Sequence, residues 1–216
     1  MKRYIIVGLG KANKKIKPAS FYQLGSKLAS KCNVEKTQNV SIIFPPQLAE
    51  SIVNDTSNST SGELNEKLSS HFSDMACQFY TTLYSDNRYR TRDNKKFPAE
   101  KLSSVKFILD MECDDSEAKN ESIDITSALV EGKNIARGLY LAKDIVNAPH
   151  NVLNSDSLAD TARKVAKESN GLIQCNILGK EECEKRGMGA FLGVARGSET
   201  DPQFIHLVYK GEGEIK

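Results

Sequence analysis

The sequence has almost no excess of charge of either sign. Its 216 residues include 30 Lys and Arg against 28 Asp and Glu, which gives a formal net charge of +2. Such a balance removes the long-range attraction that draws strongly basic proteins to nucleic acid or to anionic membranes. The contents of 39% hydrophobic and 27% charged residues are ordinary for a globular domain. We therefore expect no membrane partner, and we do not expect nucleic acid to be the main partner.

Long hydrophobic runs and paired cysteines are also missing. The apolar run at residues 4–7 is too short for the hydrophobic region of a signal peptide, and its β-branched residues predict a strand. Because neither a secretory signal nor a transit peptide is recognisable, we expect a cytoplasmic protein. The five cysteines are widely spread and never spaced as C-x-x-C. This pattern favours reduced thiols over a disulfide framework or a structural zinc site.

Several short catalytic motifs are absent or incomplete. The candidate residues are Gly8-Leu9-Gly10-Lys11, His71, His150, His206, Cys183 and Ser198. The glycine turn lacks the spacing of a phosphate-binding loop, and the histidines have no partner at the H-x-x-x-H spacing of a zinc site. The serine lies outside a G-x-S-x-G elbow, and no histidine is placed to activate the cysteine. We predict structural or surface roles for all of them.

The apolar periodicity predicts an α/β architecture, with strands and helices alternating along the chain. Strands are predicted at residues 4–7, 40–44, 105–111, 172–178 and 204–209; helices are predicted at 19–31, 63–83, 123–146, 155–169 and 181–186, with a short helix at about 48–53. Polar or irregular segments are expected at 54–62, 85–100 and 112–121. The helix at 123–146 is on the order of 35 Å long, enough to link two domains.

Two further patterns have functional and structural interpretations. Glycines at 187, 189, 193 and 197 predict tight turns or close backbone packing in an apolar segment. A basic stretch with nearby tyrosines resembles the combination that contacts phosphates and stacks on bases. Its members are Lys11, Lys14, Lys15, Lys17, Arg88, Arg90, Arg92, Lys95 and Lys96, with Tyr80, Tyr84 and Tyr89. Interleaved acidic residues favour a solvated loop instead, so nucleic-acid binding is kept as an alternative.

Four separated segments between residues 140 and 210 carry a family resemblance. They begin at Tyr140 (YLAKDIVNAPHNVL), Leu158 (LA), Met188 (MGAFLGVARGS) and Phe204 (FIHLVYK). Together and in this order they resemble the start of the catalytic domain of the leucyl aminopeptidases (cytosol aminopeptidases), particularly the plant-like ones. Two departures mark a divergent member: Asn154-Ser155 replaces the usual Thr-Pro, and Lys143-Asp144 replaces the usual Arg-Asp.

The resemblance implies a fold in three parts. It implies part of the N-terminal α/β domain at residues 1–121, a linking helix at 122–146, and the truncated start of an α/β metallopeptidase domain at 147–216. It also implies a hexamer that uses two divalent metal ions, Mn or Zn, to release N-terminal residues such as leucine from peptides during protein turnover.

The family's metal-binding and substrate-binding motifs do not occur in this sequence. We therefore assign no catalytic, metal-binding or substrate-binding residue to it and expect these 216 residues alone to be inactive. The alternatives are a catalytically dead binding or assembly module, and nucleic-acid binding by the N-terminal part. A plastid location is possible if an N-terminal segment is missing. The strand at 204–209 is expected to lack its neighbours and to make the isolated chain prone to association.

Overall fold

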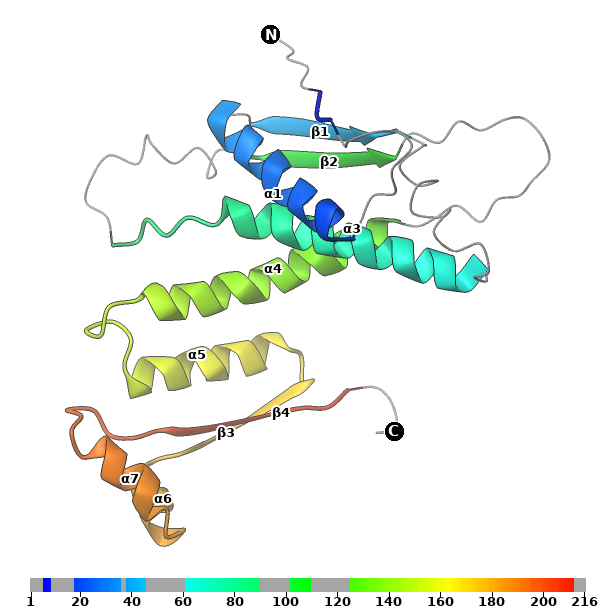
Figure 1. Cartoon of the computed structure of the whole chain (residues 1–216). Helices are drawn as coiled ribbons and strands as arrows, with labels where there is room; N and C mark the ends of the chain where they lie inside the picture. The colour runs from blue at the N-terminus through cyan, green and yellow to red at the C-terminus, as the bar shows by residue number, and fades with distance from the viewer. Residues whose placement is uncertain are drawn as a thin grey trace. The chain divides into compact units, whose positions relative to one another are not determined.

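A computed structural model describes residues 6–8, 18–35, 38–45, 61–89, 102–109 and 125–211 (Figure 1). The chain is mixed α/β, as expected, and divides into two compact units, residues 1–142 and 143–216. Within the described ranges, no helix is both long enough and apolar enough to span a membrane. The short helix predicted at 48–53 and the acidic segment at 112–121 lie outside the described residues.

The first unit is built on a β-α-β arrangement. Strand β1 (Asn39–Phe44) pairs in parallel with β2 (Ser104–Leu109), and helix α3 (Ser61–Leu83) lies between them in sequence. Parallel neighbours require such a crossover, because a tight turn can join only antiparallel strands. Helix α1 (Pro18–Glu35) packs along α3 (Figure 1).

Aromatic side chains fill the core of this unit. The α3 residues Leu68, Phe72, Met75 and Phe79 are fully buried, as their spacing along the helix predicts. Phe72 contacts Phe21 of α1 and Phe44 of β1 edge to face, with ring centroids 5.3 and 5.4 Å apart. Edge-to-face pairs stabilise a core beyond the apolar area they bury. The packing of α1 and α3 on the sheet is therefore determined by alternate residues of β1 and by one apolar stripe along α3.

Helix α4 (Ile125–Asn147) contacts α3 through small residues. The buried line is Ala128, Gly132 and Ala136, four residues apart. A Cβ added to Gly132 would overlap the Ser73 carbonyl oxygen and lie 2.9 Å from Ala76 Cβ, so the two helix backbones are in close contact. The helix predicted at 123–146 is confirmed.

Helix α5 (Ser155–Glu168) and a two-stranded antiparallel sheet form the base of the second unit. Strand β3 (Ile173–Leu178) pairs with β4 (Phe204–Tyr209), and the short helices α6 (Lys180–Lys185) and α7 (Gly189–Ala195) connect them. Figure 1 shows α5 running beside this sheet. Ala159 and Ala162 are the buried residues of α5.

Three sequence-based expectations are wrong. Ile6 and Val7 of the first predicted strand lie outside any strand, and Ile6 is 97% exposed, because neither pairs with β1 or β2 in the described sheet. The segment with several glycines forms α7, and a Cβ at Gly189 or Gly193 would meet nothing within 4 Å. The strand at 204–209 does have a neighbour, β3. Tight turns are confirmed at Gly187, which has φ of 68°, and at Gly197, where the Ser198 N–H donates to the Ala195 carbonyl oxygen at 3.0 Å.

Candidate functional site

Histidine at position 71 has a structural role in α3. Its Nδ1 lies 2.7 Å from the Lys67 carbonyl oxygen, one helical turn earlier. Its ring meets Phe21 of α1 edge to face at a centroid distance of 5.9 Å. The ring therefore closes the side of the aromatic core, as expected for a histidine beside an apolar stripe.

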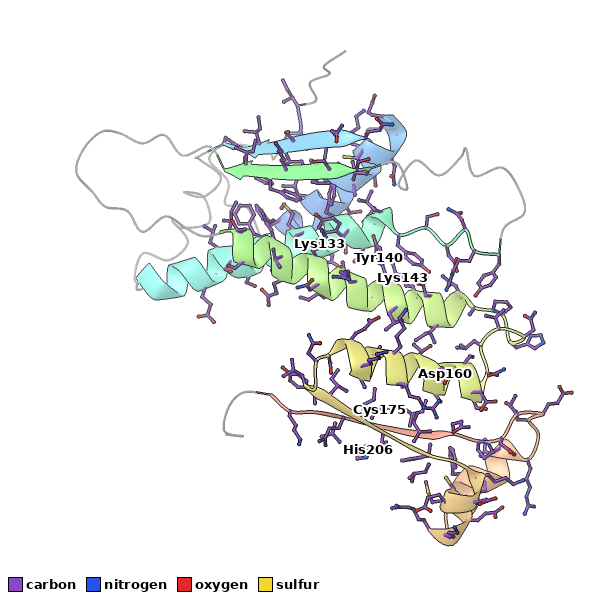
Figure 2. All side chains as sticks on the ribbon, turned by 180° about the vertical axis from the view of Figure 1, so that it is seen from behind. Lys133, Tyr140, Lys143, Asp160, Cys175 and His206 are labelled. Atoms are coloured by element: carbon purple, nitrogen blue, oxygen red, sulfur yellow. The ribbon has the colours of Figure 1, made fainter. Side chains whose placement is uncertain are left out.

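The other two histidines are on the surface of the second unit. His150 lies in the turn after α4 and is exposed. His206 is exposed on β4, opposite Asn176 of β3. Figure 2 shows His206 and Cys175 on opposite sides of this sheet, as the alternation of side chains along strands requires. Among the described residues, no three His, Cys, Asp or Glu side chains come together in a way that could hold a metal ion.

Neither candidate nucleophile has an activating partner of the required kind. Cys183 is fully buried in α6, and its thiol donates to the Leu178 carbonyl oxygen at 3.7 Å. Ser198 is exposed, and its Oγ lies 3.1 Å from Thr200 Oγ1 and accepts from the Thr200 backbone N–H at 3.2 Å. The Cys183 thiol is buried inside α6, and the Ser198 hydroxyl bonds within a turn. Both residues therefore have structural roles.

The basic and aromatic candidates are only partly described. Arg88 makes two hydrogen bonds of 2.9 Å to the Asp86 carboxylate, and its guanidinium lies 5.1 Å from the Tyr89 ring centroid. Asp86 thus pairs with the Arg88 guanidinium, which would otherwise be open to a phosphate. Residues 90–96 and Lys11–Lys17, with most of the glycine turn at residues 8–11, lie outside the described ranges.

Two tyrosines form a joint between α3 and α4. The Tyr140 hydroxyl donates to the carbonyl oxygen of Tyr80, and Figure 2 shows Tyr140 on α4 with Lys133 further along it. That carbonyl belongs to the last turn of α3, where carbonyl groups lack partners within the helix. Lys133 Nζ lies 5.7 Å from the Tyr80 ring centroid, and the Tyr84 ring packs against Tyr140 at 5.1 Å. The cluster anchors α4 at the end of α3.

The environment of this joint shifts both phenols in the same direction. Burial raises the pKa of Tyr80 above its usual value. Burial, and then the charge that Tyr80 would carry, raise the pKa of Tyr140. Both hydroxyls therefore stay protonated at neutral pH, where Tyr140 acts as a donor. We interpret the joint as a helix cap and not as acid–base machinery.

A polar clamp, defined as Asn154, Ser155, Asp156, Thr200, Asp201 and Gln203, fixes the start of α5 to the loop before β4. Asn154 caps α5 in a reciprocal capping box with Ser157. Ser155 Oγ donates to the Asp201 carbonyl oxygen at 2.6 Å, and it lies 2.9 Å from Thr200 Oγ1, a hydroxyl that can donate to it. Gln203 Nε2 donates to the Asp156 carboxylate at 2.9 Å.

The clamp gives the Asn154-Ser155 step a physical role that the sequence analysis missed. An Asn followed three residues later by Ser at a helix start was the available signal. The contacts of Ser155 could not have been inferred, because their partners lie more than 40 residues away in sequence. The clamp thus joins residues 154–156 to residues 200–203, two stretches that lie between the resemblance segments.

Comparison with known proteins identifies what the second unit is similar to. The model of the cytosol aminopeptidase family, catalytic domain, matches residues 140–216. The Arabidopsis thaliana protein called leucine aminopeptidase 3, chloroplastic, is 31% identical over 216 residues, which cover 100% of this chain and 32% of that protein.

Two solved structures share the fold of the chain. A mutant of tomato leucine aminopeptidase matches with a TM-score of 0.70 and 27% identity, over 97% of this chain and 36% of that one. The bottromycin maturation enzyme BotP, in complex with Mn, matches with a TM-score of 0.65 and 22% identity, over 95% of this chain and 36% of that one. The chain thus spans about a third of the length of the proteins it matches.

Proposed function

Since the chain belongs to the cytosol aminopeptidase family, we propose that it is a segment of a leucyl aminopeptidase. The whole protein would release N-terminal residues, leucine above all, from peptides in intracellular protein turnover. The observation that carries the proposal is the match of residues 140–216 to the family's catalytic domain, together with the similarity of nearly the whole chain to tomato leucine aminopeptidase.

The cofactors of the whole protein would be two divalent metal ions, Mn or Zn, bound by residues outside this chain. Two such ions polarise a scissile carbonyl and supply a hydroxide-like nucleophile near neutral pH. The described residues do not fit such a site, because they form no cluster of three candidate ligands. The manganese bound by BotP supports the choice of metal.

The contribution of this chain would be to build the scaffold on which that chemistry takes place. The clamp orders the start of α5 against the entry to β4, and the Tyr140 joint anchors α4 on α3. We propose a partial N-terminal domain at residues 1–121, a linking helix at 122–146, and the start of the catalytic domain at 147–216. Peptides would be the substrates and a homo-hexamer the assembly, in the cytoplasm or, as for the Arabidopsis relative, in the chloroplast.

The decisive experiment is to read the transcript past the codon for Lys216. An open reading frame that continues into the glycine-rich metal-binding motif of the family supports the proposal. A stop codon at that point would instead support a catalytically dead binding module. The purified 216-residue chain should not cleave leucine anilide with Mn or Zn; activity that survives repurification and disappears with a chelator would contradict this assignment of sites.

Limited proteolysis tests the proposed domain limits. The first cuts are expected within residues 112–121 or 54–62, since both segments are polar and have little to bury. The linking helix should remain intact while these cuts accumulate. Mass spectrometry of the early fragments would identify the sites, and early cleavage inside residues 123–146 would refute the division.

A further inference from the structure

The turn that joins α5 to β3 contains the only Asn-Gly pair of the sequence, Asn170-Gly171. Asn170 has φ of 51° and Gly171 has φ of 92°. The Leu172 N–H donates to the Ser169 carbonyl oxygen at 3.2 Å. Positive φ at both central residues and this hydrogen bond are typical of a type I′ turn, for which Asn-Gly is a preferred pair. Asn170 and Gly171 are both exposed.

Hydrogen bonds hold the residues on both sides of this pair. Ser169 Oγ accepts from the Ile173 N–H at 2.9 Å, and the Leu172 carbonyl oxygen accepts from the Lys210 N–H at 2.9 Å. The bond that closes the turn joins its first and fourth residues, so it leaves the N–H of Gly171 unused. Glycine also has no Cβ, so the backbone nitrogen of Gly171 can be approached closely. Contacts within this chain therefore shape the turn and leave its central peptide open to reaction.

We propose that Asn170 is a site of spontaneous deamidation. The Gly171 backbone nitrogen attacks Cγ of the Asn170 side chain, and the bond from Cγ to the side-chain nitrogen breaks. The proton of the Gly171 N–H leaves with that nitrogen as ammonia, and a five-membered succinimide ring remains. Water then opens the ring, at Cγ to give aspartate or at the main-chain carbonyl to give isoaspartate. One water is consumed and one ammonia released, with no change of oxidation state.

Both products alter the connection between α5 and β3. Isoaspartate adds one carbon atom to the main chain between Ser169 and Leu172, the two residues whose hydrogen bond closes the turn. Either product also places a new negative charge just beyond the C-terminus of α5, where the helix dipole disfavours it. Aspartate still tolerates the positive φ of this position. We therefore expect isoaspartate to loosen the turn more than aspartate does.

Ageing of the 216-residue chain in a mildly alkaline buffer, followed by tryptic mapping, measures the modification. The peptide of residues 168–180 contains Asn170 and also Asn176, which lies in β3 before an isoleucine and serves as an internal control. Asn154 is a second control, because its side chain accepts from the Ser157 N–H. Asn170 should react at least about tenfold faster than either control. Its product should include isoaspartate, which reversed-phase chromatography separates from aspartate.

A matched variant tests the structural consequence. Asn170→Gly removes the reactive amide and still accepts a positive φ. In hydrogen exchange, the Leu172 amide should lose protection in the aged wild-type chain and keep it in the equally aged variant; equal loss in both would overturn this consequence. The site itself would be refuted by an intact Asn170 when a synthetic peptide of residues 168–180 has been fully converted, by aspartate as the only product, or by controls that react as fast. None of these outcomes depends on peptidase activity.

Discussion

Two glycines of the same helix should respond in opposite ways to the same substitution. In α4, a Cβ at Gly132 would overlap the Ser73 carbonyl oxygen and lie 2.9 Å from Ala76 Cβ and from the Cys77 nitrogen. Gly138 is exposed, and a Cβ there would meet nothing within 4 Å. Because both glycines lie inside the same helix, their intrinsic helix propensity is matched, and only the surroundings differ.

The expected magnitudes follow from these surroundings. Carbon atoms in contact prefer about 3.5–4.0 Å, so Gly132→Ala forces α4 roughly 0.6–1.1 Å away from α3 and weakens contacts along the buried line. Overpacking of this kind costs about 1–3 kcal/mol. Gly138→Ala should instead stabilise the helix by about 0.5–1 kcal/mol, because alanine loses less backbone entropy on folding. Because the propensity gain is common to both substitutions, the two variants should differ by the packing cost alone, about 1–3 kcal/mol.

Urea unfolding followed by circular dichroism at the helical wavelength measures the difference. With a slope of about 1–3 kcal/mol per molar urea, the midpoints should be separated by roughly 1 M. A Gly132→Ala variant as stable as Gly138→Ala would refute the close approach of the α3 and α4 backbones. The double substitution should be additive within about 0.5 kcal/mol, since only one of the two sites contacts α3.

Two further substitutions test the cap and the joint. Asn154→Ala should lower the free energy of unfolding by about 0.5–2 kcal/mol, as for other N-cap residues, in urea titrations of the chain. Tyr140→Phe should cost about 0.5–1.5 kcal/mol at pH 7 through the lost hydrogen bond to Tyr80. Because burial raises the pKa of Tyr140 in the folded chain, its contribution to stability is complete below pH 10 and is lost as the pH rises through the raised value. The Phe variant should therefore lose less stability than wild type as the pH rises above 10; equal alkaline losses in the two proteins would contradict the joint.

Most of the long helices and the strands were predictable, because their signal is local. The spacing of Leu68, Phe72 and Phe79 predicts a helix over 63–83, and the structure has α3 at Ser61–Leu83. The strands predicted at 40–44 and 204–209 match β1 and β4 within one residue. In each case a single face is buried, so the periodicity of the sequence follows the geometry of the element directly.

The sequence-based predictions fail where a residue's burial depends on a helix that is distant in sequence, or where a residue type such as glycine is compatible with more than one local structure. The helical spacing of residues 125, 128, 132, 135, 139, 142 and 146 predicts one inward stripe on α4. Ala128 and Gly132 are buried as this spacing predicts, whereas Ile135 and Leu139 are 48% and 41% exposed. Large residues dominate a periodicity pattern, whereas close helix packing selects small ones. Of the glycines at residues 187–197, Gly187 and Gly197 lie in turns as expected, whereas Gly189 and Gly193 lie in α7 between them.

The polar groups of the described residues serve the scaffold. No buried side-chain N or O atom in these residues lacks a hydrogen-bond partner. Asn154 and Tyr140 cap helix ends, and Ser155 joins the start of α5 to the loop before β4. These contacts stabilise two helix ends and one connection between segments that are distant in sequence. Catalytic centres, by contrast, concentrate acids and bases whose pKa is tuned to a reaction. A scaffold of this kind can tolerate Asn-Ser in place of Thr-Pro, since Asn154 caps the helix as a Thr would, and the Ser155 hydroxyl makes a hydrogen bond that a proline could not make. Divergence at this step and retention of the fold are therefore compatible.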